Sequence, residues 1–140
     1  MTLGARGLAR MIDANANRAR EGLRVVEDVL RFVRVDAALS GEARRLRHVV
    51  TAAVTALGPA RTLLAARDAR SDPGRARWRG GTRQDAGALL RANFRRAQEA
   101  VRVLEEGARL ALKAGPARRL QAIRYRLYAL ESRAGVRSHR

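Results

Sequence analysis

The sequence predicts an all-α protein: a helical bundle of two helical hairpins related by a pseudo-twofold axis, with four main helices and one short helix. Three observations favour it. Apolar residues recur at steps of three and four, the apolar side chains are mostly Ala, Leu and Val, and one long motif occurs twice. Small aliphatic side chains suit closely spaced helices. A length of 140 residues suits one core, so we expect a single helical domain over residues 1–140.

The repeated motif covers residues 13–28, DANANRAREGLRVVED, and residues 91–106, RANFRRAQEAVRVLEE. Both copies keep Asn, Arg, Glu and Val at the same spacing, and GEARRL at residues 41–46 matches GPARRL at residues 115–120. Each half is therefore a long helix followed by a shorter one, which indicates a hairpin. The halves span about residues 8–66 and 82–132, and a loop at residues 67–81 joins them.

In the first half, a long helix is expected over residues 8–35. Its apolar stripe is formed by Ile12, Ala19, Leu23, Val26, Leu30 and Val33. A second helix should begin after Asp36 or Ser40, which are both good N-cap residues, and should end at the Gly-Pro pair at 58–59. The proline then suits the first position of a short helix over residues 59–66.

The second half should begin with another long helix. Thr82 with Asp85 three residues later resembles a capping box, so we expect this helix to start at Thr82 and to end at the Gly-Pro pair at 115–116. The last helix is expected over residues 117–132, with a basic tail after Gly135. Its apolar residues are Leu120, Ile123, Leu127 and Leu130.

Composition excludes several classes of site. The absence of cysteine excludes disulfides and thiolate chemistry, and only two histidines argue against a histidine metal site. No apolar run reaches the roughly 18 residues of a membrane span, so a cytoplasmic protein is expected. A net charge of +17 suggests an anionic partner, which could be nucleic acid, a membrane surface or a phosphorylated small molecule. Lys113 is the only lysine, so the arginine excess partly reflects coding bias.

A helical wheel places polar residues of the motif at defined positions. Asn15 and Asn93 fall inside the apolar stripe, where each amide either fixes the helix register or faces a polar cavity. Arg18 and Arg96 lie at the edge of the stripe. The outward residues are Glu21, Arg24 and Asp28. They form either a ladder of surface ion pairs or a face that packs against another subunit, and the latter predicts a homo-oligomer.

The loop at residues 67–81 combines side chains that suit phosphate chemistry. Arg67 can bind phosphate, Asp68 and Asp72 can bind magnesium, and a glycine follows. A disordered basic linker is the alternative. Residues 61–96 hold ten arginines against three aspartates, which favours anions. The sequence lacks the P-loop, dinucleotide, serine-elbow and zinc-helix motifs, so an enzyme here would use Arg, Asp, Glu and Asn.

Four sequence blocks follow in order over about residues 12–131: DANANRAREGLRVVEDVLRF, RD with DPG, ANFRRAQEAVRVLEE and RYRLYALE. Together they resemble the small hydroxymethylpyrimidine-phosphate kinase family of thiamine biosynthesis, which occurs alone or fused N-terminally to thiamine phosphate synthase. The resemblance implies ATP-dependent phosphorylation of 4-amino-5-hydroxymethyl-2-methylpyrimidine phosphate to the diphosphate, with Mg²⁺. One departure is Ala69, where a hydroxyl residue is expected, so Ser71 would have to replace it.

This chemistry suggests roles for the residues singled out above. Phosphates would be held by Arg18, Arg67 and Arg96, and Mg²⁺ by Asp68 and Asp72. Substrate contacts would come from Asn15 and Asn93, supported by Glu21 and Glu99, and Tyr125 would either stack on the pyrimidine or belong to the core. Two alternatives remain. One is a non-catalytic helical partner of thiamine phosphate synthase, and the other is a basic nucleic-acid-binding protein, which the scarcity of aromatic residues disfavours.

Overall fold

The computed structural model describes residues 4–76 and 81–135, and within these ranges it is helical and contains no strand. The all-α prediction is confirmed. Residues 77–80 of the loop and the basic tail expected after Gly135 lie outside the described residues. The elements are α1 (Ala5–Asp28), the π-helical turn η1 (Val29–Val33), α2 (Ala37–Thr55), α3 (Ala60–Ala66), α4 (Ala86–Leu110) and α5 (Ala114–Arg133).

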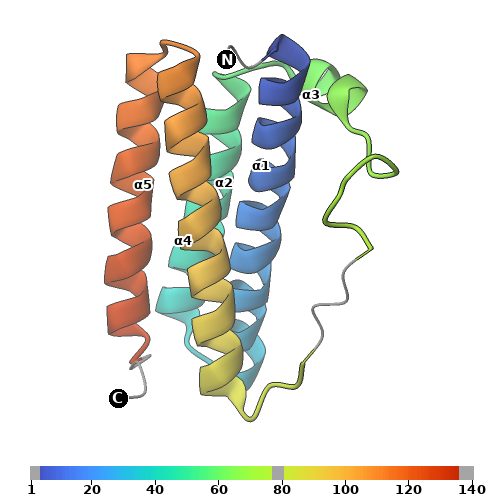
Figure 1. Cartoon of the computed structure of the whole chain (residues 1–140). Helices are drawn as coiled ribbons and strands as arrows, with labels where there is room; N and C mark the ends of the chain where they lie inside the picture. The colour runs from blue at the N-terminus through green and yellow to red at the C-terminus, as the bar shows by residue number, and fades with distance from the viewer. Residues whose placement is uncertain (1–3, 77–80, 136–140) are drawn as a thin grey trace.

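The four long helices form a bundle in which each one packs against two others. The long helices α1 and α4 pack on each other, each packs on the second helix of its own half, and α2 packs on α5 (Figure 1). The short helix α3 lies against α1. One continuous aliphatic core fills the centre, with Phe94 as its largest buried side chain. This arrangement agrees with the two hairpins predicted from the repeat.

A glycine permits the close approach of α1 and α4. A Cβ atom added to Gly22 would lie 3.0 Å from the backbone oxygen of Asn93 and 3.4 Å from the backbone nitrogen of Ala97. Backbone atoms cannot swing aside as a flexible side chain can, so a larger residue at this position would push the helices apart. The alanine-rich stripes on both helices fit the same close spacing.

The predicted stripe of the first helix is confirmed except at its end. Five of its six members are buried, but Val33 is 62% exposed. The helix changes to π geometry at Val29, where the N–H of Arg34 donates to the Val29 carbonyl at 2.9 Å. Each turn of a π-helix contains more residues than an α-turn. The phase of the stripe therefore shifts, and Val33 faces outward.

Helix starts follow the side chains that cap them. Asp36, one of the two candidates, caps α2, because its carboxylate accepts the N–H of Leu39 at 2.9 Å. The capping box expected at Thr82 is wrong. The cap of α4 is Asp85, whose carboxylate accepts the N–H of Ala88 at 2.8 Å. An aspartate that reaches the N–H three residues ahead needs no second partner, so the helix begins after it.

The turn between α4 and α5 also differs from the prediction. The long helix ends at Leu110, and Leu112 takes a left-handed backbone conformation with φ of 59°. The Gly-Pro pair at 115–116 lies in the first turn of α5, not at the end of α4. Proline is tolerated there because the first N–H groups of a helix have no acceptor within the helix.

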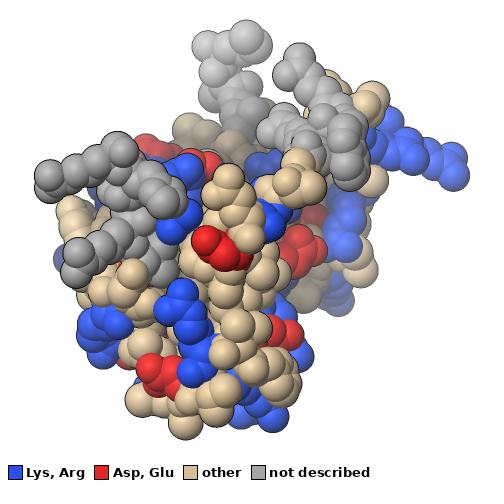
Figure 2. Space-filling model, turned by 90° about the horizontal axis from the view of Figure 1, so that it is seen from below, with Lys and Arg blue, Asp and Glu red and all other residues tan. Residues whose placement is uncertain are grey.

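Charge on the lower end of the bundle is mixed. Figure 2 shows basic side chains there interspersed with acidic and uncharged ones, so the described residues form no continuous basic surface on that face. Nucleic-acid binding usually requires a basic patch or stripe, and this face does not offer one. Among the described residues, no single helix is long and apolar enough to cross a membrane, and one pair, α2 with α3, passes the length and composition test only across an 81° bend.

Candidate functional site

An ion pair fixes the start of the loop to the first helix. Arg67, which follows α3, donates from Nε and Nη2 to the two carboxylate oxygens of Asp13 on α1, at 2.8 Å each. The Asp13 side chain is only 9% exposed. Its hydrogen bonds and its negative charge raise the pKa of Arg67. Because the contact is bidentate, it fixes the direction of the guanidinium as well as its position.

Aspartates organise the next part of the loop. The carboxylate of Asp68 accepts the N–H of Ser71 at 3.1 Å, and its backbone carbonyl accepts from Arg10 at 3.2 Å. The hydrogen bonds of Ser71, side chain first and then backbone, lower the pKa of Asp68. Asp72 likewise accepts the N–H of Gly74 at 2.9 Å. These bonds produce tight turns in the described part of the loop.

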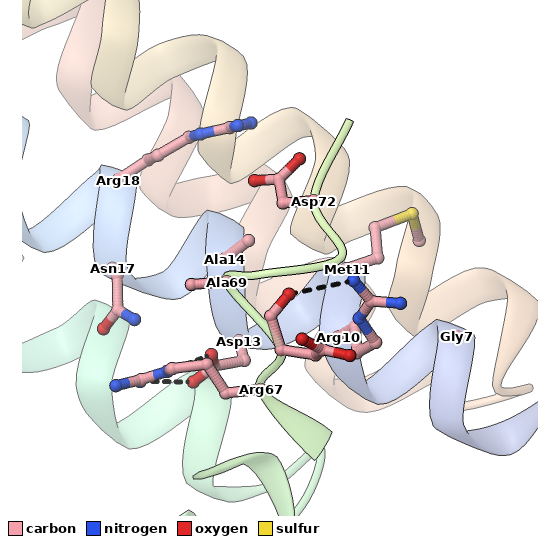
Figure 3. Close-up of a pocket in the computed structure, with 11 residues that line it drawn as sticks. Gly7, Arg10, Met11, Asp13, Ala14, Asn17, Arg18, Arg67, Ala69 and Asp72 are labelled. Atoms are coloured by element: carbon pink, nitrogen blue, oxygen red, sulfur yellow. Dashed lines mark hydrogen bonds and ion pairs between the residues drawn. The ribbon is translucent and has the colours of Figure 1, made fainter. Parts of the chain in front are cut away.

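The loop and α1 border a first, open cavity of about 380 Å³, called here the loop cavity (Figure 3). It is lined by Gly7, Arg10, Met11, Asp13, Ala14, Asn17, Arg18, Arg67, Asp68, Ala69 and Asp72. Arg18 and Asp72 lie at one end of this group, and the Arg67 to Asp13 ion pair lies at the other (Figure 3). The loop cavity therefore has arginines at both ends and carboxylates beside them.

A second cavity of about 450 Å³, called here the interhelix cavity, lies between α1, α4 and the loop. It is lined by Asn15, Arg18, Asp72, Gly74, Arg75, Arg96, Glu99, Ala100 and Val103. Both cavities include Arg18 and Asp72 in their linings. They therefore adjoin, and these two side chains stand where they meet.

Most of the residues predicted as site residues line one of the two cavities. The loop cavity brings together Arg18, Arg67, Asp68 and Asp72, and the interhelix cavity adds Asn15, Arg96 and Glu99. The remaining three, Asn93, Glu21 and Tyr125, line neither cavity.

Those three residues lie at other positions in the bundle. Asn93 sits beside Gly22, further along the contact between α1 and α4. Glu21 is exposed on α1, with its carboxylate 4.0 Å from Arg96. Tyr125 is on α5, which packs on α4 and α2, and the residue is 58% exposed. It belongs neither to the core nor to the cavities.

The two asparagines of the motif make the same local bond. The amide of Asn15 donates to the Met11 carbonyl and that of Asn93 to the Leu89 carbonyl, both at 2.9 Å. Each amide is thus satisfied inside its own helix, which fits a structural role in both copies. Asn15 also lines the interhelix cavity, so only the first copy combines this bond with a place at the candidate site.

In the part of the chain that the structure describes, candidate magnesium ligands come at most in pairs of carboxylates. Among the described residues, no group of three or more His, Cys, Asp or Glu side chains is arranged to hold a metal ion. Asp68 and Asp72 line the loop cavity together, and the backbone N–H groups of Ser71 and Gly74 bind one oxygen, Oδ1, of each carboxylate. Two carboxylates fit Mg²⁺ that also carries phosphate and water ligands, which is its usual state in nucleotide sites.

Sequence reasoning missed Asp13 and two buried glutamates, Glu27 and Glu105. Glu27 binds Arg47 of α2 at 3.2 Å, and Glu105 binds Arg124 of α5 at 2.9 Å. Each pair joins the two helices of one hairpin. A signal was present, since both glutamates lie four residues after a residue of the apolar stripe, as a helical wheel would show. Asp13 has no such signal, because its partner is 54 residues away.

Comparison with known proteins places this chain among thiamine-related sequences. Residues 10–133 match the model of the ThiD2 family. Similar curated proteins include those named thiamine-phosphate synthase from Thermosynechococcus vestitus, 45% identical over 128 residues, and from Rhodopirellula baltica, 34% identical over 127 residues. Each alignment covers 89% of this chain but only 34% and 33% of those proteins, so the chain spans about a third of their length. No solved structure matches the chain at a significant level.

Proposed function

We propose that this chain, which belongs to the ThiD2 family, transfers a phosphoryl group from ATP to hydroxymethylpyrimidine phosphate and so forms the diphosphate. One observation carries the proposal: two adjoining cavities share Arg18 and Asp72, and further arginines line each of them. A transfer between two phosphorylated substrates needs two binding spaces whose phosphates meet. The shared residues stand at such a meeting point.

The reaction suits arginine and aspartate. The accepting group is a phosphate oxygen that is already ionised at neutral pH, so a strong general base is unnecessary. The main obstacle is repulsion between two anions, which positive charge and correct positioning reduce. In this proposal Arg67 holds the acceptor phosphate in the loop cavity, Arg96 holds nucleotide phosphates in the interhelix cavity, and Arg18 stabilises the phosphoryl group between them.

Asp68 and Asp72 would hold the Mg²⁺ that accompanies ATP, and the ion would neutralise phosphate charge. The two hydrogen bonds that Arg67 donates to Asp13 hold its guanidinium in the wall of the loop cavity. Ser71 donates its backbone N–H to Asp68, so it contributes to the loop despite the alanine at position 69. The chemistry therefore relies on side chains from α1, α4 and the loop.

The direct test is turnover. The protein is incubated with ATP, Mg²⁺ and the pyrimidine monophosphate, and the diphosphate is followed by phosphorus NMR. Arg18→Ala should lower kcat/KM by about 100-fold or more, as expected when a charge that stabilises a transition state is removed. Arg24→Ala is the matched control, because Arg24 is an exposed arginine of the same helix outside both cavities. No turnover by the wild-type protein with Mg²⁺ or Mn²⁺ would refute the proposal.

A second candidate is a non-catalytic helical partner of thiamine phosphate synthase. It is supported by the relatives, since the matching segment in them is part of proteins named thiamine-phosphate synthase. This candidate predicts that the chain co-elutes with a separately expressed synthase and shows no kinase turnover. Turnover without co-elution would reject it.

A further inference from the structure

A third cavity lies on the other side of the Asp13 to Arg67 ion pair. This cavity, called here the Thr51 cavity, has a volume of about 240 Å³ and lies between α1, α2 and α3. Its lining includes Arg20, Thr51, Thr55, Val54 and Leu63. None of these five residues lines the loop or the interhelix cavity.

The three cavities lie next to one another in a row. The Thr51 cavity shares Asp13 and Arg67 with the loop cavity, and the loop cavity shares Arg18 and Asp72 with the interhelix cavity. The linings of the Thr51 cavity and the loop cavity meet at the ion pair, so a ligand that occupied both would lie beside Asp13 and Arg67. The row has a small cavity at one end and the largest of the three at the other.

We propose that the Thr51 cavity holds the aminopyrimidine ring of the acceptor substrate, with the phosphate of that substrate in the loop cavity. The nucleotide then enters from the interhelix cavity. This inference rests on the proposed function and adds to it the order in which the two substrates lie along the row of cavities. It also assigns a binding role to α2 and α3.

Size and lining favour a single ring. The volume is below the roughly 300–1,000 Å³ of typical pockets for drug-sized ligands, which makes a nucleoside triphosphate a poor fit. Val54 and Leu63 are buried aliphatic residues of the cavity wall, and Leu64, which is 58% exposed, adds the accessible apolar surface for a ring face. Pockets for small molecules generally combine such apolar walls with a few polar groups.

The polar groups of the cavity match the edge of an aminopyrimidine. The hydroxyl of Thr51 donates to the Arg47 carbonyl at 3.2 Å, and that of Thr55 donates to the Thr51 carbonyl at 3.0 Å. Each hydroxyl proton is used, so the oxygen lone pairs are free to accept from an exocyclic amino group. Arg20 donates through Nη2 to Asn17, and its remaining N–H groups can donate to ring nitrogens.

Variants that fill the cavity test the inference. Thr51→Phe and Thr55→Phe each place a ring in the cavity from an exposed position of α2, where the helix should still fold. Thr62→Phe is the control, because Thr62 is exposed on α3 and does not line the cavity. Circular dichroism checks that all three fold. Calorimetry with the pyrimidine monophosphate alone, without ATP, then measures its Kd.

We expect Thr51→Phe and Thr55→Phe to raise this Kd at least about tenfold, a loss of ~1.4 kcal/mol, while the KM for ATP stays within about twofold. The control should bind as the wild-type protein does. Wild-type affinity in both cavity variants would overturn the inference, and so would a raised KM for ATP with unchanged affinity for the pyrimidine.

A measurement on the wild-type protein needs no variant. Addition of the pyrimidine monophosphate should shift the methyl NMR signals of Thr51 and Thr55 but not that of Thr62. If the ligand shifts the first two signals but no diphosphate is formed, the proposed function fails and the inference stands. If turnover occurs without these shifts, the inference alone fails. If the pyrimidine monophosphate does not bind at all, both fail.

Discussion

The buried Glu105 gives the sharpest prediction about stability. Its side chain is fully buried on α4, and its carboxylate accepts from Nε of Arg124 on α5 at 2.9 Å. Arg102 and Arg109 also reach it, at 3.4 and 3.3 Å, but both are about half exposed, whereas the Arg124 side chain is only 11% exposed. Glu105→Gln keeps the shape of the side chain and removes its charge. The arginine on α5 then stays buried without a counter-charge.

The expected loss follows from this geometry. Breaking a buried ion pair on one side costs about 3–5 kcal/mol. The glutamine oxygen still accepts a hydrogen bond, and the two half-exposed arginines can turn to water, so the lower end of this range applies. We expect the free energy of unfolding to fall by about 3 kcal/mol, which corresponds to a decrease in Tm of roughly 10 °C for a chain of this size.

Urea unfolding followed by circular dichroism measures the loss, with Glu106→Gln as the matched control. Glu106 is the exposed neighbour and pairs with Arg102 on the surface at 3.3 Å, so its substitution should cost less than about 0.5 kcal/mol. The loss of unfolding free energy for Glu27→Gln should lie between those of the other two variants, at about 2 kcal/mol, because its partner Arg47 is 21% exposed. Equal stability of the Glu105→Gln and Glu106→Gln proteins would refute the reasoning.

A double substitution separates charge burial from packing. Replacing both Glu105 and Arg124 by apolar residues of similar volume, as in Glu105→Met with Arg124→Leu, removes the buried charges together. Such replacements are often neutral or stabilising. The double variant should therefore be more stable than Glu105→Gln alone, and a larger loss would mean that the pair contributes more than its desolvation costs.

Two further predictions concern helix spacing and the loop. Gly22→Ala should lower the free energy of unfolding in urea by about 1–3 kcal/mol, because the added Cβ would meet the Asn93 backbone oxygen at 3.0 Å. Gly107→Ala is the control: its Cβ meets only side chains, at 3.4 Å or more, so the loss of stability should be smaller. Ser71→Ala should raise the pKa of Asp68 part of the way toward its ordinary value of 3.8, because the side-chain hydrogen bond of Ser71 is lost. Carbon NMR should then show the Asp68 carboxylate taking up its proton at a higher pH than in the wild-type protein. An unchanged pKa would contradict a role of the Ser71 hydroxyl in lowering it.

The fold was predictable because it depends on local patterns of apolar residues within each helix. Residues such as Leu23 and Leu104 recur at helical spacing, and they are buried as that spacing requires. Boundaries were less predictable where two residues competed for the same role. The N-cap of α4 is Asp85 and not Thr82. The apolar pattern did not indicate the π-helical turn that begins at Val29.

The candidate site was predictable in part, for a related reason. Arg18 and Arg96 stood out because they occur in both copies of the motif, and both line the interhelix cavity. The loop residues stood out by composition. The sequence could not predict long-range pairing. The contact that seats the loop joins Asp13 to Arg67 across 54 residues, and no local pattern around either residue indicates its partner.

That same contact explains why the loop cavity and the Thr51 cavity form beside the first copy of the motif. The two copies of the motif agree at Asn15 and Asn93 and at Arg18 and Arg96, but the position of Asp13 is taken by an arginine in the second copy. An arginine cannot accept the hydrogen bonds of Arg67, so only the first copy can seat a loop that begins with a guanidinium. The repeat builds the bundle, and the aspartate at position 13, which the second copy lacks, seats the start of the loop that borders the candidate site.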